Sequence, residues 1–477
     1  MKSCLSSSIR RQRRKNASVL IVVLWIAVGM VSIALYFANS MTYELRASDN
    51  RVCGLAADQA IEGAARYVGY ILYNYATNGA MPQTTEYHAE AVPIGDAHFW
   101  FIGHDPAETP SSDPYFGLVD EASKLNLNTV GTNTLMALPN VTPDFAEAIV
   151  DWRSTNGLGM YSLDYSSLGY DDKNAPFETV DELRMVYGAT MDVLVGNDPN
   201  LNGVLDPGES STGTGAGTIT STAANGQVQP GLLELCTVYT REPNFLTYNG
   251  EDVLMTNVST ASQTDLEALF QSADVNSSYA STIHSYTHPT TARGAPATTR
   301  GFNGILDFCV FCKNAGMSSQ DFSKIYPYVT TSTATYIRGR VNIDTAGLTV
   351  LTALFWGVGY SQGVDQSTAE SAAQTVINYR QQNQGNLYSV AWLVDALGTT
   401  SPVIKALQTG DYITARTYQF EADIAAVGPN GRGYRRVKFI FDTSDGTPKI
   451  IYRQDLSSLG WALGDKARQT WVASATQ

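Results

Sequence analysis

Residues 18–38 form a long apolar run in which no charged side chain occurs. These 21 residues match the roughly 20 helical residues that span the hydrocarbon core of a bilayer. The segment that follows contains no proline up to about residue 75, and apolar residues recur in it at every fourth position, which is a helical spacing. The pattern predicts one helix over residues 18–75, with a small-sided face that could lie on a sheet and consists of Val52, Ala56, Ala60, Ala64, Val68 and Leu72.

Alternating apolar and polar positions predict β-strands near both ends of the chain. Residues 86–105 alternate on either side of a Gly95-Asp96 turn, which is typical of a β-hairpin. Residues 415–456 contain three further strand patterns, separated by Gly-Pro-Asn-Gly and Ser-Asp-Gly turns. If these strands form one sheet with the long helix, the residues between about 106 and 412 are a single large insertion.

The insertion is mostly helical in pattern and contains an internal repeat. Residues 124–157 ("KLNLNT…DWRSTNG") and 340–385 ("RVNIDT…INYRQQNQG") each contain an Asn-aliphatic-Asn/Asp-Thr motif, a short helix, a turn and a helix that ends in aromatic-Arg. A degraded third copy starts near residue 254 ("LMTNVST"), and residues 211–227 have the composition of a flexible linker. The unit is a pair of helices joined by a hairpin.

These patterns predict an α+β fold: a pilin-like long N-terminal helix plus a small antiparallel sheet, with a large, mostly α-helical inserted domain. The insertion would contain SAM-like or helix-hairpin-helix repeats near residues 124–190 and 340–398. The expected divisions are a basic leader (1–17), a transmembrane part of the helix (18–38), the rest of the helix with the first hairpin (39–105), the insertion (106–412) and the C-terminal strands (413–477).

Charge is distributed unevenly along the chain. The formal net charge is −14, but six cations precede Ala17, so the remainder carries −20. A polyanion of this size repels phosphate backbones, which argues against nucleic-acid binding. The cations should hold the N-terminus in the cytoplasm, and the apolar run is longer than the h-region of a cleaved signal peptide. We therefore expect a retained single-pass anchor, with the bulk of the protein across the membrane.

Residues 198–209 ("DPNLNGVLDPGE") carry oxygen-bearing side chains at the spacing of an EF-hand calcium loop. Gly203 occupies the sixth position, where such a loop turns sharply. The pattern predicts a structural calcium ion, because residues 211–217 ("STGTGAG") cannot form the second helix of a calcium sensor. The expected ligands are Asp198, Asn200, Asn202, the carbonyl group of Val204, Asp206 and Glu209.

Several other residues could act in catalysis or bind a metal, but their sequence contexts do not suit these roles. Ser361 in "GYSQG" follows a helical pattern rather than the strand that a nucleophile elbow needs. His284 and His288 form an i, i+4 pair without the glutamate of a zinc protease. Cys309 and Cys312 lack further zinc ligands nearby and are expected to be buried thiols or a local disulfide. The sequence therefore gives us no set of residues that predicts an enzyme.

The segments "SVLIVVLW", "KLNLNT", "FAEAIVDWR", "GRVNIDT" and "YRQDLSSLGW" make the chain similar to general secretion pathway protein K, over essentially its full length. This family comprises large minor pseudopilins of bacterial type II secretion. The resemblance implies that prepilin peptidase cuts after Ala17, so that Ser18 becomes the mature and methylated N-terminus. Ala17 stands where the family usually has glycine, and Val22 stands where most other pilin-like subunits have a glutamate.

The resemblance also implies a function. Such subunits are non-catalytic, cap the tip of the pseudopilus alongside other minor pseudopilins, and in some cases bind calcium in the inserted domain. The implied partners are those minor pseudopilins, the major pseudopilin, the inner-membrane secretion platform and prepilin peptidase. The implied location is the bacterial inner membrane, with the bulk in the periplasm. Assembly contacts are expected along the helix at Val22, Trp25, Val52, Ala56, Ala60 and Ala64.

Two other functions are compatible with parts of the sequence. A membrane-anchored DNA receptor of a competence or type IV pilus-like system would also place helix-hairpin-helix units after one membrane span. In "LPNVTPDFAEAIVDWR", however, Asn140 and Thr142 replace the hairpin glycines whose amides approach a phosphate. An envelope hydrolase would have to use Ser361 as its nucleophile.

Overall fold

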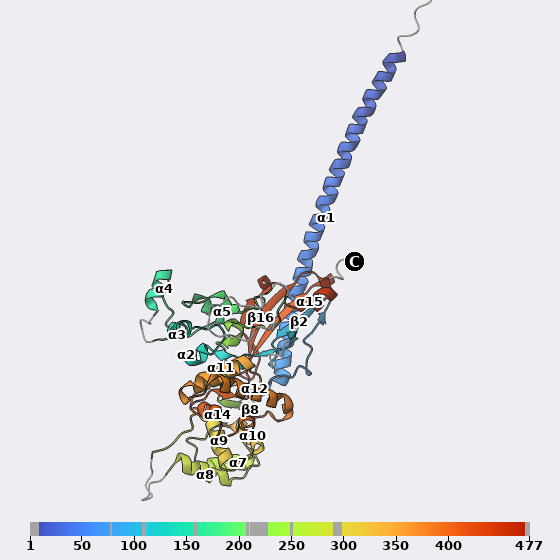
Figure 1. The fold of residues 1–477 in the computed structure, drawn as a ribbon. Helices are drawn as coiled ribbons and strands as arrows, with labels where there is room; N and C mark the ends of the chain where they lie inside the picture. Colours follow the sequence, from blue (N-terminus) through green and yellow to red (C-terminus); the bar gives the residue numbers. More distant parts are fainter. Residues whose placement is uncertain are drawn as a thin grey trace, which may run out of the picture.

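The computed structural model describes residues 9–76, 79–106, 111, 113–155, 161–206, 209, 228–248, 251–289 and 298–472. Its first element, α1 (Ile9–Tyr75), is one uninterrupted helix of 67 residues. In Figure 1 the N-terminal part of α1 projects as a stalk from the rest of the protein, whereas its C-terminal part packs against a sheet. The predicted helix over residues 18–75 is present and begins earlier, at Ile9. The predicted linker over residues 211–227 lies outside the described residues.

The main sheet combines strands from both ends of the chain, in the antiparallel order β1-β2-β15-β16-β17. The predicted hairpin and the three C-terminal strands are therefore present, and the fold is α+β with a long N-terminal helix and an antiparallel sheet. Two short strands from beyond residue 105 also join this sheet, so it extends into the region that we assigned to the insertion. The strands are β1 (Val92–Ile94), β2 (Ala97–Gly103), β3 (Tyr115–Phe116), β4 (Val119–Asp120), β15 (Gln419–Val427), β16 (Arg435–Asp442) and β17 (Lys449–Asp455).

One face of this sheet packs against α1. Small residues on the helix allow its backbone to approach the strands closely, and large side chains from the strands fill the space between them. The helix contributes Ala57, Ala60, Ile61, Ala64, Ala65, Val68, Ile71 and Leu72, and the strands contribute Phe99, Phe101, Phe420, Ile424, Val437, Phe439 and Phe441.

This packing corrects the expected assembly surface. Ala60 and Ala64 are 1% and 0% exposed because they lie in the core between α1 and the sheet. They are therefore not available to another subunit. Val52, one turn before this core begins, is 59% exposed, and Ala56 is half-buried. The sequence pattern placed all four residues on one face, but this face enters the protein's own core after residue 56.

Two glycines hold the loop between β15 and β16 against α1 at the point where the helix meets the sheet. A Cβ atom at Gly428 would overlap the carbonyl oxygen of Cys53, and one at Gly433 would overlap the backbone of Cys53. Gly433 also has a φ of +74°, a conformation that other residues rarely adopt. Only glycine at these positions permits such a close contact between loop and helix.

Residues 125–413 contribute to a second and larger hydrophobic core. Its helices are α2 (Thr132–Met136), α3 (Pro143–Trp152), α4 (Ser162–Leu168), α5 (Met191–Val195), α6 (Leu232–Leu235), α7 (Gln263–Ser272), α8 (Ser278–Thr287), α9 (Ile305–Asn314), α10 (Ser319–Ile325), α11 (Leu348–Gly359), α12 (Gln366–Gln382), α13 (Ala391–Leu397) and α14 (Pro402–Leu407). Short strands connect them: β5 (Leu125–Asn126), β6 (Cys236–Thr237), β7 (Arg241–Pro243), β8 (Phe245–Tyr248), β9 (Glu251–Leu254), β10 (Thr256–Asn257), β11 (Val329–Thr330), β12 (Tyr336–Arg338), β13 (Val341–Asn342) and β14 (Ile413–Thr414).

Within the described residues the repeated unit occurs three times, and the degraded copy near residue 254 is one of the three. Each copy begins with a short strand whose asparagine side chain accepts a hydrogen bond from the backbone N–H two residues later. Each of these strands pairs in parallel with a strand from a distant part of the chain: β5 with β6, β10 with β11, and β13 with β14. The asparagines are Asn126, Asn257 and Asn342, with N–H···O distances of 2.8, 2.9 and 3.0 Å.

An arginine at the end of the second helix closes two of the three units. Arg380 donates to the carbonyl oxygens of Ile343 and Ala346, at 3.1 and 2.9 Å. Arg153 makes the same pair of contacts in the first unit, to the carbonyls of Leu127 and Val130. In the middle unit the position of this arginine is occupied by Thr287, the buried last residue of α8. The apolar residues Ala280 and Ile283, which precede it on the same helix, establish this alignment. The loss of this arginine explains why the middle copy is hard to recognise in the sequence.

We expect Gly428→Ala to separate the loop from α1 and to lower the stability of the protein by about 1–3 kcal/mol, as overpacking does elsewhere. Thermal unfolding of the full-length chain in detergent micelles measures this effect. Gly69→Ala is the matched control, since a Cβ atom on this helical glycine meets open space. The control should be neutral or stabilising by up to about 1 kcal/mol. Equal effects of the two substitutions would contradict the proposed close contact.

We expect Asp344→Asn to change how stability depends on pH. Burial raises the pKa of Asp344 to about 7, so the folded protein favours the protonated acid, and stability falls as the pH rises from about 4 to 7. Asparagine, which the first unit has at the equivalent Asn128, mimics the protonated form and can still accept the hydrogen bond from Trp392. The melting temperature of the variant, relative to the parent, should be higher at pH 8 than at pH 5.

The matched control for this experiment is Glu370→Gln, on the exposed face of α12. Its melting temperature relative to the parent should be the same at both pH values. If Asp344→Asn behaved in the same way, the carboxyl group of Asp344 would not be the group that titrates.

Candidate functional site

The stalk part of α1 exposes a continuous apolar surface. Between Ser18 and Phe37 the chain has no charged residue, and the first charge after the cationic leader is Glu44. Trp25 and Val22, two of the expected assembly residues, are 74% and 54% exposed. By length and composition α1 is suited to cross a membrane, with its most apolar window near the N-terminus. The helix is therefore consistent with a single-pass membrane anchor.

The loop over residues 198–206 is wound as the EF-hand spacing predicts. The carboxylate of Asp198 accepts hydrogen bonds from the backbone N–H groups of Asn202 and Gly203, at 3.0 and 2.7 Å. Gly203 has a φ of +76°, so the sharp turn falls at the predicted sixth position. The chain consequently folds back around Asp198, which is completely buried.

The other expected ligands converge on the same loop. The carboxylate oxygen Oδ2 of Asp206 accepts hydrogen bonds from the side-chain amides of Asn200 and Asn202, at 2.7 and 2.9 Å. The Glu209 carboxylate in turn accepts one from the backbone N–H of Asp206, at 2.8 Å. The structure thus links the five side chains that the spacing singled out through hydrogen bonds within one loop, although their three carboxylates do not form a metal-binding cluster.

The donor set of this loop fits a hard cation. The buried oxygen Oδ1 of Asn200 has no hydrogen-bond partner among the described residues. Burial, reinforced by the charges of Asp198 and Asp206, raises the pKa of Glu209 to about 7. In the described part of the chain no three His, Cys, Asp or Glu side chains converge closely enough to hold a metal by themselves. Calcium would therefore also need the amide and carbonyl oxygens, as it does in EF-hand loops.

Arg436 attaches this loop to the sheet, and the sequence did not suggest that contact. Its guanidinium group is buried in β16, is paired with Asp423 on β15, and donates to the carbonyl oxygens of Asn200 and Leu201. The N–H···O distance to Leu201 is 2.6 Å. The loop therefore lies at the junction between the sheet and the insertion.

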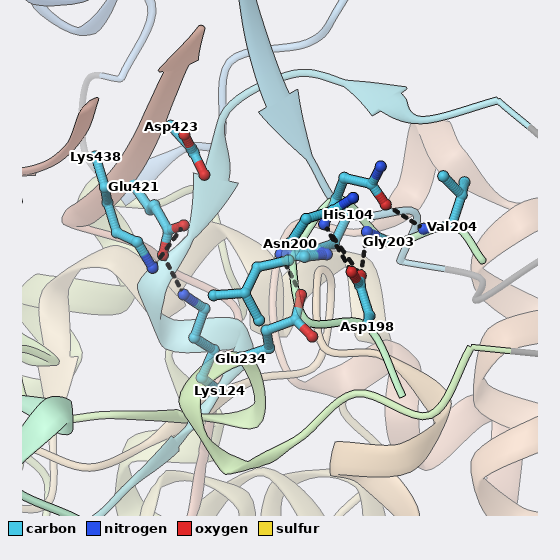
Figure 2. Close-up of polar contacts among 12 residues, drawn as sticks. His104, Lys124, Asp198, Asn200, Gly203, Val204, Glu234, Glu421, Asp423 and Lys438 are labelled. Carbon is cyan, nitrogen blue, oxygen red and sulfur yellow. Dashed lines mark hydrogen bonds and ion pairs between the residues drawn. The ribbon is translucent and has the colours of Figure 1, made fainter. Parts of the chain in front are cut away.

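Two further groups next to the loop were missed from the sequence. Glu234 on α6 is buried, and among the described residues neither of its carboxyl oxygens has a hydrogen-bond partner. Burial, together with the Asp198 carboxylate, raises the pKa of Glu234 well above its usual range. His104 lies 3.5 Å from Glu234, and burial lowers the pKa of His104 to about 4 (Figure 2).

A buried cluster of opposite charges lies beside this pair (Figure 2). Lys124 contacts both Glu121 and Glu421, and Lys438 lies 3.3 Å from Glu421. Although burial favours the neutral acid, the two ammonium groups hold the pKa of Glu421 well below its usual range. Glu421 therefore stays ionised within the junction. In the sequence, this cluster is indicated by the polar residues that alternate with apolar ones in the β15 segment "QFEADIAAV".

The remaining expected sites lie apart from this junction. Cys309 and Cys312 are buried free thiols in α9, and burial raises the pKa of both. Ser361 lies in a short helical turn after α11, not after a strand. In the hairpin before α3, the Thr142 hydroxyl accepts the backbone N–H of Phe145, at 3.2 Å. That amide is thus occupied within the protein, which does not favour a phosphate site.

A search of solved structures finds similarity to a chain in the crystal structure of the GspK-GspI-GspJ complex from the type 2 secretion system of enterotoxigenic Escherichia coli. The match covers 86% of this chain and 99% of that chain, with 11% sequence identity and a TM-score of 0.37. At this identity the likeness concerns the fold alone. A scan against protein-family models gives no match, and a search of the curated proteins gives none.

We propose that the loop over residues 198–209 binds one structural calcium ion, and we expect a chelator to lower the melting temperature of the full-length chain. Binding to the folded state alone stabilises it by about 2.7 kcal/mol when the free ion is at 100 times its Kd. Asp198→Ala should abolish the difference between calcium and chelator, whereas the exposed Glu370→Ala should preserve it. A parent protein that melts at the same temperature in calcium and in chelator would contradict the proposal.

Proposed function

We propose that this chain is a minor pseudopilin of a bacterial type II secretion system, of the general secretion pathway protein K kind. In this proposal it is a non-catalytic subunit that caps the tip of the pseudopilus and limits its growth. The observation that carries the proposal is the continuity of α1, whose exposed apolar part and sheet-packed part form a single helix. This arrangement provides both a membrane or fibre segment and a folded head.

The exposed part of α1 argues for burial in lipid or among similar helices. Fully burying one Val, Leu or Ile side chain contributes about 1.5–3 kcal/mol. The segment contains many such side chains, each more than half exposed, so an isolated stalk would be unstable in water. The large exposed residues before Ala38 are Val19, Leu20, Ile21, Val22, Val23, Leu24, Trp25, Ile26, Val28, Met30, Val31, Ile33, Leu35, Tyr36 and Phe37.

The shape of the head supports the capping role. In Figure 1 the insertion and the sheet form a body far wider than α1, and this body lies at one end of the helix. A second subunit whose helix packed alongside α1 from that end would meet the insertion. Val22 also fits a terminal position, because a lone glutamate in the apolar segment would need a neighbouring charge as its partner.

The proposed setting follows from the same features. The cationic leader keeps the N-terminus in the cytoplasm, the apolar helix crosses the inner membrane, and the head lies in the periplasm. Prepilin peptidase would cleave between Ala17 and Ser18, both of which lie in α1. The partners would be other minor pseudopilins, the major pseudopilin and the inner-membrane secretion platform. The hairpin geometry gives no specific support to a DNA receptor.

The proposal predicts one labelled copy of this protein at one end of each fibre. Pseudopili sheared from cells that express a tagged form should carry a gold label at the tip, because the wide head prevents further addition. Mass spectrometry of the same material should find Ser18 as the first residue. A tagged major pseudopilin, labelled along the shaft, is the positive control. Label along the shaft, or an intact Met1 in the sheared fibres, would contradict the proposal.

A further inference from the structure

Two histidines lie one helical turn apart at the end of α8. His284 belongs to the helix, and His288 follows its last residue, with the backbone N–H of His288 donating to the carbonyl oxygen of His284 at 2.8 Å. Their imidazole rings are stacked, with centroids 4.4 Å apart and planes 20° from parallel. Both side chains are partly exposed. The fold therefore places two imidazole groups side by side on one surface.

A hydrogen bond prepares His288 to act as a ligand. The hydroxyl of Thr287 lies 3.1 Å from the carbonyl oxygen of Ile283 and 2.9 Å from Nδ1 of His288. When this hydroxyl donates its proton to the carbonyl oxygen, Nδ1–H of His288 donates to the hydroxyl. Nε2 of His288 then carries the lone pair. A ligating histidine is typically oriented by such a bond from its other ring nitrogen.

His284 supplies a second and independent indication. Its Nδ1 atom is shielded from solvent and has no hydrogen-bond partner among the described residues. A buried polar atom without a partner is costly in a folded protein, and such atoms often mark a missing ion or water molecule. A cation bound in the plane of each ring would satisfy this nitrogen once the side chains rotate out of their stacked arrangement.

We propose that His284 and His288 form a binding site for one divalent late transition-metal ion, such as Zn²⁺, Ni²⁺ or Cu²⁺. Imidazole nitrogens suit these ions, whereas calcium prefers oxygen ligands. In the described part of the chain no third His, Cys, Asp or Glu completes the set, so water fills the remaining positions. In Figure 1, α8 lies at the end of the head opposite the stalk, away from α5, after which the chain enters the loop over residues 198–209. This site is independent of the proposed function.

Isothermal titration calorimetry of the full-length chain in detergent micelles, with Zn²⁺ in the presence of excess Ca²⁺, tests the proposal. We expect one Zn²⁺ ion per chain. His284→Ala should weaken binding by about 100-fold, within the range that linking two ligands provides. Glu370→Ala, on the exposed face of α12, should leave Zn²⁺ binding unchanged. Cu²⁺ bound to the same protein should give an electron paramagnetic resonance spectrum with coupling to two nitrogens.

The double variant Ser285→His/His288→Ala is the matched control. It keeps His284 and the number of histidines, but the second imidazole now extends from another face of the helix, since adjacent residues do not face each other. Its Zn²⁺ affinity should fall as far as that of His284→Ala, while its melting temperature stays at the parental value. Thr287→Val, which removes the orienting hydroxyl, should weaken binding by about tenfold.

Two results would overturn the proposal. One is a parent protein that gives no Zn²⁺-dependent heat. The other is Zn²⁺ binding of equal strength in the parent and in the double variant, because it would show that the pairing of the two rings is irrelevant.

Discussion

The buried charges on the second face of the main sheet hold this protein together as one unit. β15 is buried on both of its faces: one face is apolar, and the other carries Glu421 and Asp423 next to a small apolar cluster that includes Ala425 and Val427. Its polar side presents Glu421 to Lys124 and Asp423 to Arg436, so that charges on the central strand are paired inside the protein. Removing one partner of such a pair costs about 3–5 kcal/mol, because the other charge remains buried and unpaired. The position of the insertion on the sheet depends on these pairs.

The sheet is consequently a middle layer with two different neighbours. On one face, alanines of α1 meet a row of phenylalanines, and ion pairs such as Arg435–Asp58 lie at the edge of this apolar contact. On the other face, ion pairs and the loop that includes Asp198 connect the sheet to the insertion. Because a single strand, β15, takes part in both contacts, the stalk and the head are joined through the same few residues. A connection of this kind suits the terminal position in a fibre that we propose.

The insertion shows how a repeated unit can diverge while its backbone geometry persists. In all three copies an asparagine side chain holds the turn after a short parallel strand. The closing arginine is kept in the outer copies as Arg153 and Arg380, whereas the middle copy has Thr287. This difference leaves the threonine hydroxyl beside His288 in the middle copy. Divergence at one buried position thus accompanies a pair of imidazoles that the other copies lack.

Much of the architecture follows from local patterns in the sequence. The uninterrupted apolar run predicts α1, alternation around Gly95 predicts the first hairpin, and the position of Gly203 predicts the sharp turn that the structure has there. These features depend on residues that are close together in the chain. Their helical period, turn preference or ligand spacing can be recognised without knowing what packs against them.

The tertiary structure alone decided which surfaces are covered. The alternation in β15 does not distinguish a face exposed to water from one that meets buried cations, because polar side chains suit both environments. Likewise, the small residues Ala60 and Ala64 could pack equally well against a partner subunit or against the protein's own sheet. The pairing of His104 with Glu234 joins residues 130 positions apart. Contacts of this kind depend on how distant segments of the chain pack together, so a local sequence pattern does not predict them.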